Sequence, residues 1–148
     1  MKRPIVPSLA VCAALAIALT ACNRAESPSQ VAADVAEAQA DRSEAIADAR
    51  MQEAETLSDT ATAAASRDMD DRGDAIEDRA EARYDTAIAE ARGDFEVARQ
   101  GCESLSGSAQ VDCTNSAEAA YDAARESAER ELDAERERSD QVQQLDNR

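Results

Sequence analysis

The residues of this chain that could do chemistry are four cysteines, because the other common catalytic types are missing or scarce. The sequence has no histidine, its single lysine is Lys2, and it contains neither a nucleophile elbow nor a glycine-rich phosphate loop. Carboxylates are abundant, but a carboxyl pair with raised pKa values needs an apolar pocket, and large apolar side chains are too few to line one. We therefore expect no catalytic residue, no cofactor and no enzymatic activity.

The second cysteine, Cys22, ends an apparent export signal. Lys2 and Arg3 form a positive start, and the apolar run that follows, residues 9–20, is too short to span a bilayer. It ends in Leu19-Thr20-Ala21-Cys22, which resembles the lipobox of bacterial lipoproteins. That resemblance implies cleavage before Cys22, acylation of its thiol and anchoring in the membrane. The alternative is an ordinary secretory signal followed by a chance cysteine.

The remaining pair, Cys102 and Cys113, predicts a structural disulfide, since Cys12 would be removed with the signal and exported proteins fold in an oxidising compartment. A redox or metal-binding pair is the alternative. The spacing is not Cys-x-x-Cys, and no histidine is present to complete a zinc site. We expect no metal ligands.

The segment from Cys102 to Cys113, with the pattern Cys-x2-Leu-x-Gly-x5-Cys, resembles a bend in small alanine-rich exported proteins of Gram-negative bacteria. The resemblance covers about 30 residues and implies a stapled helical hairpin, without an activity. In plan the chain is also similar to the murein lipoprotein, a lipid-anchored helical rod. It departs at the C-terminus, where no lysine offers a covalent link to peptidoglycan.

The charge of the chain is strongly negative. The net charge of −16 becomes −18 when Lys2 and Arg3 leave with the signal. Such a surface repels nucleic acid and anionic headgroups, so membrane contact must come from the lipid. Alanine, glutamate and arginine favour helix, whereas large apolar residues are scarce. The composition predicts long helices with a thin core.

The pattern along the chain predicts an all-α fold, a long amphipathic, coiled-coil-like rod with an antiparallel hairpin stapled near its C-terminal end. Ser27-Pro28-Ser29-Gln30 is typical of a helix start with a capping box. Gly73 is the expected kink or break, although one glycine leaves a continuous helix open. The predicted segments are a signal peptide (1–21), a lipidated tether (22–27), an N-terminal helix (28–72), a hairpin (74–140) with its bend at 103–110, and a frayed tail (141–148).

The hairpin has a predicted register, because apolar or small residues recur every three or four positions on both sides of the bend. With Cys102 opposite Cys113, the antiparallel pairing places Phe95 beside Ala120 and Tyr121. It also places Ile88 beside Ala128 and Tyr84 beside Leu132.

Two short motifs invite functional readings that the residues do not support. Asp68-Met69-Asp70 begins like a calcium loop, but the fifth and twelfth positions are Arg72 and Arg79, not oxygen ligands. Arg-Gly-Asp occurs twice, around Gly73 and Gly93. In a chain this rich in arginine and aspartate, we attribute both copies to chance.

The sequence thus predicts a lipoprotein of the outer membrane that faces the periplasm and has a structural or spacing role in the envelope. Asn23 favours this membrane, because it is not the aspartate that retains many enterobacterial lipoproteins in the inner one. The expected partners are the membrane, a second copy of the chain or a helical periplasmic protein, and no nucleic acid. The alternative function is an acidic helical module that binds a periplasmic protein.

Overall fold

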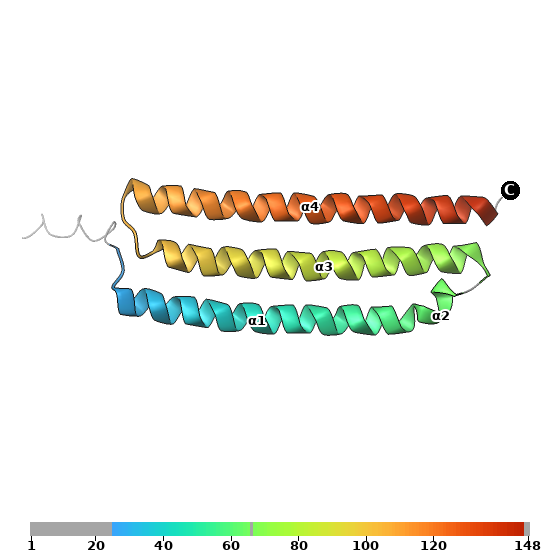
Figure 1. Cartoon of the computed structure of the whole chain (residues 1–148), viewed down its shortest axis with the longest axis horizontal. Helices are drawn as coiled ribbons and strands as arrows, with labels where there is room; N and C mark the ends of the chain where they lie inside the picture. Colours follow the sequence, from blue (N-terminus) through green and yellow to red (C-terminus); the bar gives the residue numbers. More distant parts are fainter. Residues whose placement is uncertain (1–24, 66, 147–148) are drawn as a thin grey trace, which may run out of the picture.

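The computed structural model describes residues 25–65 and 67–146, and these residues form four helices and no strand. The helices are α1 (Pro28–Asp59), α2 (Ala61–Ala64), α3 (Met69–Cys102) and α4 (Ser108–Asp146). Figure 1 shows the three long helices side by side, with each antiparallel to its neighbour. The all-α fold and its helical hairpin are as the sequence predicts.

Helix α3 lies in the middle of the layer. It packs against α1 on one side and against α4 on the other, while α1 and α4 do not contact each other within the described residues. The N-terminal helix therefore folds back along the hairpin, which the sequence analysis did not foresee. The result is a layer one helix thick, about 50 Å long for a helix of 34 residues.

The start of α1 follows from the capping box that the sequence predicts. The Ser27 side chain accepts a hydrogen bond from the Gln30 N–H, and the Gln30 side chain accepts one from the Ser27 N–H. At the other end, the hydroxyl of Thr60 donates to the Thr56 carbonyl and accepts from Arg79 Nε of α3, at 2.7 Å each. Thr60 is buried, so this hydroxyl ties the end of α1 to the central helix.

The predicted N-terminal helix 28–72 and the break at Gly73 are wrong. Helix α1 ends at Asp59, the short helix α2 follows, and α3 begins at Met69 and continues through Gly73. The side chain of Asp68 accepts from the Asp70 N–H at 3.0 Å, which starts α3 several residues earlier than expected. The chain reverses direction at the N-cap of α3. Gly73 lies inside this helix, where it is a packing site and not a break.

The hairpin is also longer than the predicted segment 74–140. The bend itself falls within the expected range, at residues 103–107, and Gly107 adopts a positive φ of 65° there. Helix α4 continues to Asp146, so residues 141–146 of the predicted frayed tail are helical. Two contacts hold this end: the buried Ser139 hydroxyl donates to the Gly73 carbonyl at 2.9 Å, and Gln143 Nε2 donates to Asp74 at 3.1 Å.

The register of the hairpin is confirmed at its staple and at its aromatic pair. Cys102 and Cys113 form a disulfide with their Cα atoms 5.7 Å apart. The rings of Phe95 and Tyr121 lie with centroids 5.8 Å apart. The same offset persists to the far end, where Arg136 Nη2 lies 2.8 Å from Glu81. The predicted neighbours Ile88 and Ala128 stay a prediction.

The core is thin because alanine fills most of it. The buried apolar residues are Val31, Ile46, Ala75, Ala80, Ala91, Cys102, Ala117 and Ala128. Each alanine buries little area, so the hydrophobic contribution per residue is small. Stability must rest on helix propensity, on many small contacts and on the staple.

Two glycines of α3 let long polar side chains of the neighbouring helices cross close to its backbone. A Cβ on Gly73 would lie 2.6 Å from Gln143 Cγ, and one on Gly93 would lie 2.9 Å from Arg42 Cβ. In each case the head group then binds the aspartate that follows the glycine. Gln143 donates to Asp74, and Arg42 Nε lies 2.6 Å from Asp94. Both Arg-Gly-Asp sequences are therefore helical, and their glycines are packing sites.

We expect Gly93→Ala to lower the free energy of unfolding by about 1–2 kcal/mol, because the added methyl group pushes α1 away from α3. Gly101→Ala is the matched control, since a Cβ there meets nothing within 4 Å. That change should stabilise by up to about 1 kcal/mol through helix propensity. Urea unfolding followed by circular dichroism measures both. Equal stabilisation by the two changes would contradict the close approach of Arg42.

Reducing the disulfide should lower the free energy of unfolding by about 2–3 kcal/mol while the helix content stays the same, because the staple acts mainly on the entropy of the unfolded chain. Urea unfolding with and without dithiothreitol measures the difference. Cys113→Ser is the control, because it has no disulfide and its stability should not respond to the reductant. A loss of helix on reduction would show that the staple also holds the local structure.

Candidate functional site

The sequence-predicted site residues fall in different places. Cys22, the proposed lipidation site, lies outside the described residues. Cys102 and Cys113 are brought together, and Cys102 is 1% exposed. Because Cys102 is shielded from solvent, this disulfide is suited to a structural role.

The residues nearest the predicted anchor are fixed to the bend of the hairpin. The Glu26 N–H donates to the Glu103 carbonyl at 2.9 Å, directly before the N-cap of α1. The start of α1 and the α3–α4 bend thus lie at the same end of the layer (Figure 1). Any anchor that precedes residue 25 is attached at this end, close to the disulfide.

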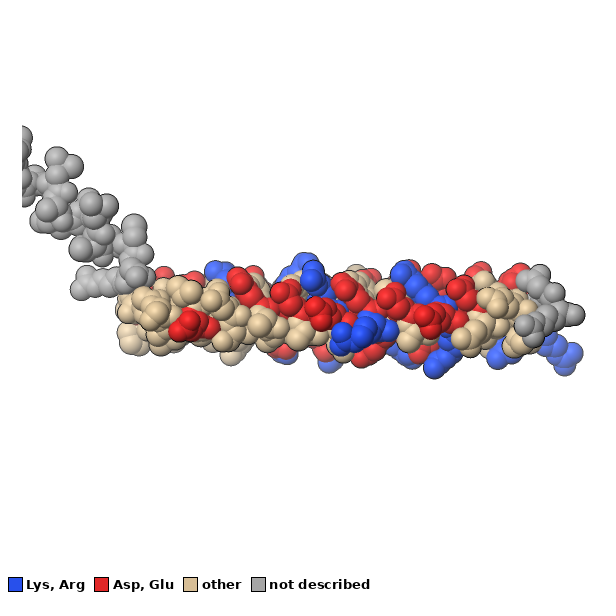
Figure 2. All heavy atoms as spheres, turned by 90° about the horizontal axis from the view of Figure 1, so that it is seen from above, with Lys and Arg blue, Asp and Glu red and all other residues tan. Residues whose placement is uncertain are grey.

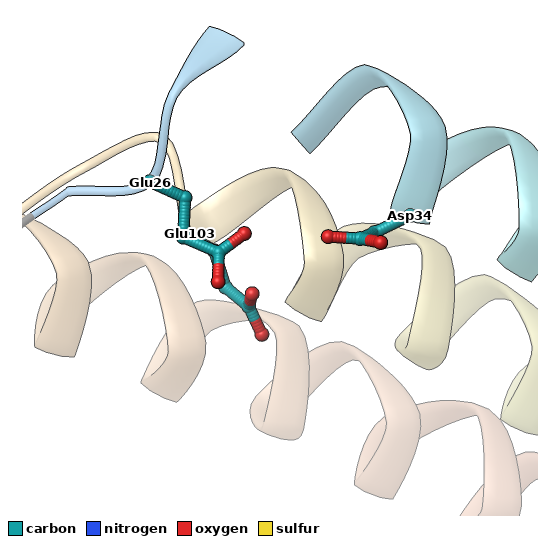
Figure 3. A group of neighbouring side chains, drawn as sticks. All are labelled: Glu26, Asp34 and Glu103. Atoms are coloured by element: carbon teal, nitrogen blue, oxygen red, sulfur yellow. The ribbon is translucent and has the colours of Figure 1, made fainter. Parts of the chain in front are cut away.

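Three carboxylates meet at this end. Glu26 comes from the segment before α1, Asp34 from α1 and Glu103 from the bend (Figure 3). One oxygen of each lies within 4.8 Å of the others. Partial loss of water, and then the charges of Glu103 and Asp34, raise the pKa of Glu26 above its ordinary value of 4.5. Oxygen ligands of this kind suit hard cations, but acidic groups gather easily in a chain with 32 of them, and no second feature of the described residues points to a ligand.

The calcium reading of residues 68–79 fails structurally as well. Asp68 is the N-cap of α3 and Asp70 lies in its first turn. The twelfth position, Arg79, lies in the helix and donates to Thr60. These residues form a helix start and not a ligand loop.

One broad face of the layer carries an acidic groove between α1 and α3. Near the α3–α4 bend, Asp34, Glu37 and Asp41 of α1 line it opposite Arg92, Glu96 and Arg99 of α3. Its continuation toward the other end is lined by Asp59 of α1 and by Asp78, Glu81 and Asp85 of α3. Asp78, Asp85 and Arg92 are spaced by seven residues, which keeps them on one side of the helix.

The opposite face carries an apolar groove between α3 and α4. Its floor contains the chain's only phenylalanine and both of its tyrosines, together with one leucine: Tyr84, Phe95, Tyr121 and Leu132. Alanines such as Ala87, Ala98, Ala120 and Ala124 form the walls. On α3 the groove residues Ala80, Ala87 and Asp94 each follow an acidic-groove residue by two positions. Two positions turn a helix by about 200°, so the grooves lie on opposite faces.

The outer edge formed by α4 differs from both grooves. Figure 2 looks onto this edge, where acidic and basic side chains alternate along its middle part. Several of them form ion pairs within α4, such as Arg125 with Asp122 and Arg138 with Glu135. Exposed pairs of this kind contribute about 0–1 kcal/mol each. This edge is a solvated surface.

The apolar stripes that form the α3–α4 contact were predicted from the sequence. Neither groove was predicted, and the carboxylate cluster was not predicted either. The available signal was in α3, where Asp78 and Asp85 of one face each precede an alanine of the other face, Ala80 and Ala87, by two positions. The carboxylate cluster carried no such signal, because it depends on the fold-back of α1.

Comparison with protein-family models, curated proteins and solved structures found no match for the chain. Within the described residues, none of the helices has the length and hydropathy needed to cross a membrane.

We expect Glu26→Gln to stabilise the protein at neutral pH, because it removes one of three converging negative charges. A carboxyl with a raised pKa in the folded state binds its proton at a higher pH than in the unfolded state. Its contribution to stability therefore falls as pH rises through that window, and the ionised cluster costs stability at pH 7. The advantage of Glu26→Gln should vanish as pH falls below 4.5.

Urea unfolding of the parent and the variant at several pH values measures this difference. Glu118→Gln, an exposed position of α4, serves as the control for removal of one charge. A Glu26→Gln protein that is less stable than the parent at neutral pH would contradict the repulsion among the three carboxylates.

Proposed function

We propose that the chain is a lipoprotein anchored through Cys22 to the outer membrane, and that it serves the cell envelope as a non-catalytic structural spacer. The observation that carries this proposal is the order of elements at its start. Leu19-Thr20-Ala21-Cys22 is separated by only a few residues from Ser27, the N-cap of a long helix. A lipidated Cys22 would thus join the membrane directly to one end of the helical layer.

The dimensions of the layer support a spacing role. A helix of 34 residues spans about 50 Å, and the anchor-proximal residues lie at one end of this length and not at its middle (Figure 1). The surplus of acidic residues repels an anionic membrane surface. A layer held by lipid at one end and repelled along its length would stand away from the membrane into the periplasm.

A second candidate function is a binding module for a cationic helical partner. The acidic groove between α1 and α3 supports it, because four acidic residues line one part without a basic neighbour in that lining. Cross-linking in intact envelopes separates the two functions. A product that contains only this chain supports the spacer, whereas a second protein that is lost when Asp78 and Asp85 become asparagine supports the module.

We expect Cys22→Ser to release the protein from membranes and to leave the signal uncut, because lipidation precedes cleavage in this export route. Fractionation of cells followed by mass spectrometry of the product measures both effects. Cys12→Ser is the control, since this cysteine lies within the signal and should be dispensable. A Cys22→Ser protein of mature size that still sediments with the outer membrane would refute the anchor.

A further inference from the structure

We propose that the apolar groove between α3 and α4 is the interface for a second copy of this chain, related by a two-fold axis that runs along the groove. The occupant would cover the floor formed by Tyr84, Phe95, Tyr121 and Leu132. The proposal concerns the surface and its partner, and it does not depend on the lipid anchor.

The fold is a layer only one helix thick. Domains are built from at least two packed layers, because one layer leaves an apolar face in water. Here α4 contacts only α3, and α1 contacts only α3 and α2, so the α3–α4 groove has no cover within the described residues. The α1–α3 groove is less suited to this contact, because the part lined by Asp59, Asp78, Glu81 and Asp85 would meet its copy with like charges.

The α3–α4 face is large enough for a stable interface. Two helices of at least 34 residues, about 50 Å long and about 20 Å wide together, offer about 1,000 Å² per copy. A stable interface buries about 800 Å² per partner. Alanine walls allow helices to approach closely, and the aromatic floor supplies the larger apolar groups typical of an interface centre.

The rim of the groove carries complementary charges. Arg83 of α3 and Glu131 of α4 both line it, at the level of Tyr84 and Leu132. The groove is also lined by Glu135 and Asp94, which are already paired with Arg138 and Arg42. Within the described residues neither Arg83 nor Glu131 makes an ion pair or a hydrogen bond. They stand on opposite rims, because one belongs to each helix.

A two-fold axis along the groove would bring these opposite charges together. It places α3 of one copy over α4 of the other at the same level, so Arg83 faces Glu131 of the second copy and the reverse pair forms as well. The same operation brings the two Phe95–Tyr121 pairs together. Both anchor-proximal ends then lie at the same end of the dimer.

The test uses two differently tagged copies of the full chain, expressed together and captured through one tag from detergent-solubilised cells. Arg83→Glu in both copies, or Glu131→Arg in both, places like charges at two symmetry-related contacts and should reduce co-capture about tenfold. Arg83→Glu in one copy with Glu131→Arg in the other should restore it. Only a contact between copies gives this rescue.

Matched variants on other surfaces serve as controls. Arg92→Glu and Asp85→Arg make the same charge changes on the acidic face and should leave co-capture unchanged. Ala120→Arg, at an exposed position of the groove wall, should abolish co-capture, whereas Ala119→Arg beside it should not, since Ala119 does not line the groove. Circular dichroism verifies that each variant keeps its helices.

The proposal is overturned if the parent copies are not captured together, if the mixed charge reversals give no rescue, or if the acidic-face variants reduce co-capture equally. It is also overturned if Ala120→Arg instead releases a different protein while the copies never associate, because the groove then serves another partner. None of these outcomes depends on Cys22, so they are distinct from failure of the anchor.

Discussion

The close approach of α1 and α4 to opposite sides of α3 is the constraint on which this structure depends. Two antiparallel neighbours are held by one helix, and that helix carries small residues on both sides. Gly73, Ala80 and Ala91 are buried on the side of α4, and Gly93 is buried beneath Arg42 of α1. A larger residue at either glycine would meet a side chain that already crosses there. The three helices therefore form a flat layer because α3 has small residues on the two sides that face α1 and α4.

The small residues of α3 also explain why long polar side chains make many of the contacts between the helices. Because alanine buries little, the neighbouring helices reach α3 through long side chains whose head groups find an oxygen beyond the contact. Arg42 reaches Asp94, Arg50 reaches Glu90, and Arg136 reaches Glu77 and Glu81. These pairs are exposed, so each adds little free energy. These ion pairs fix the register of the helices, since each pair fits only one alignment.

How much could be predicted from the sequence depends on the strength of each local pattern. The capping box at Ser27 and the pairing of Phe95 with Tyr121 were predictable, because each rests on distinctive residues at fixed spacing. The fold-back of α1 was not, since only Val31 and Ile46 are buried on this helix and its other inward positions are mostly polar or alanine, which gives no strong apolar stripe. The break was misplaced at Gly73 because a glycine that ends a helix and one that admits a neighbouring side chain are identical in sequence. Only the contact with Gln143 distinguishes them.

The distribution of charge decides what can approach each side of the layer. Asp59, Asp78, Glu81 and Asp85 concentrate negative potential in one part of the α1–α3 groove, whereas Arg42, Arg92 and Arg99 offset the acidic residues nearer the bend. The groove on the opposite face is lined mainly by alanine and aromatic residues, and its charged residues are Arg83, Asp94, Glu131 and Glu135. An anionic surface is repelled most strongly by the acidic face, while an apolar surface gains most at the other. A layer tethered beside Glu26 would accordingly meet cationic groups through one face and apolar helices through the other, and the two contacts would not compete for the same side chains.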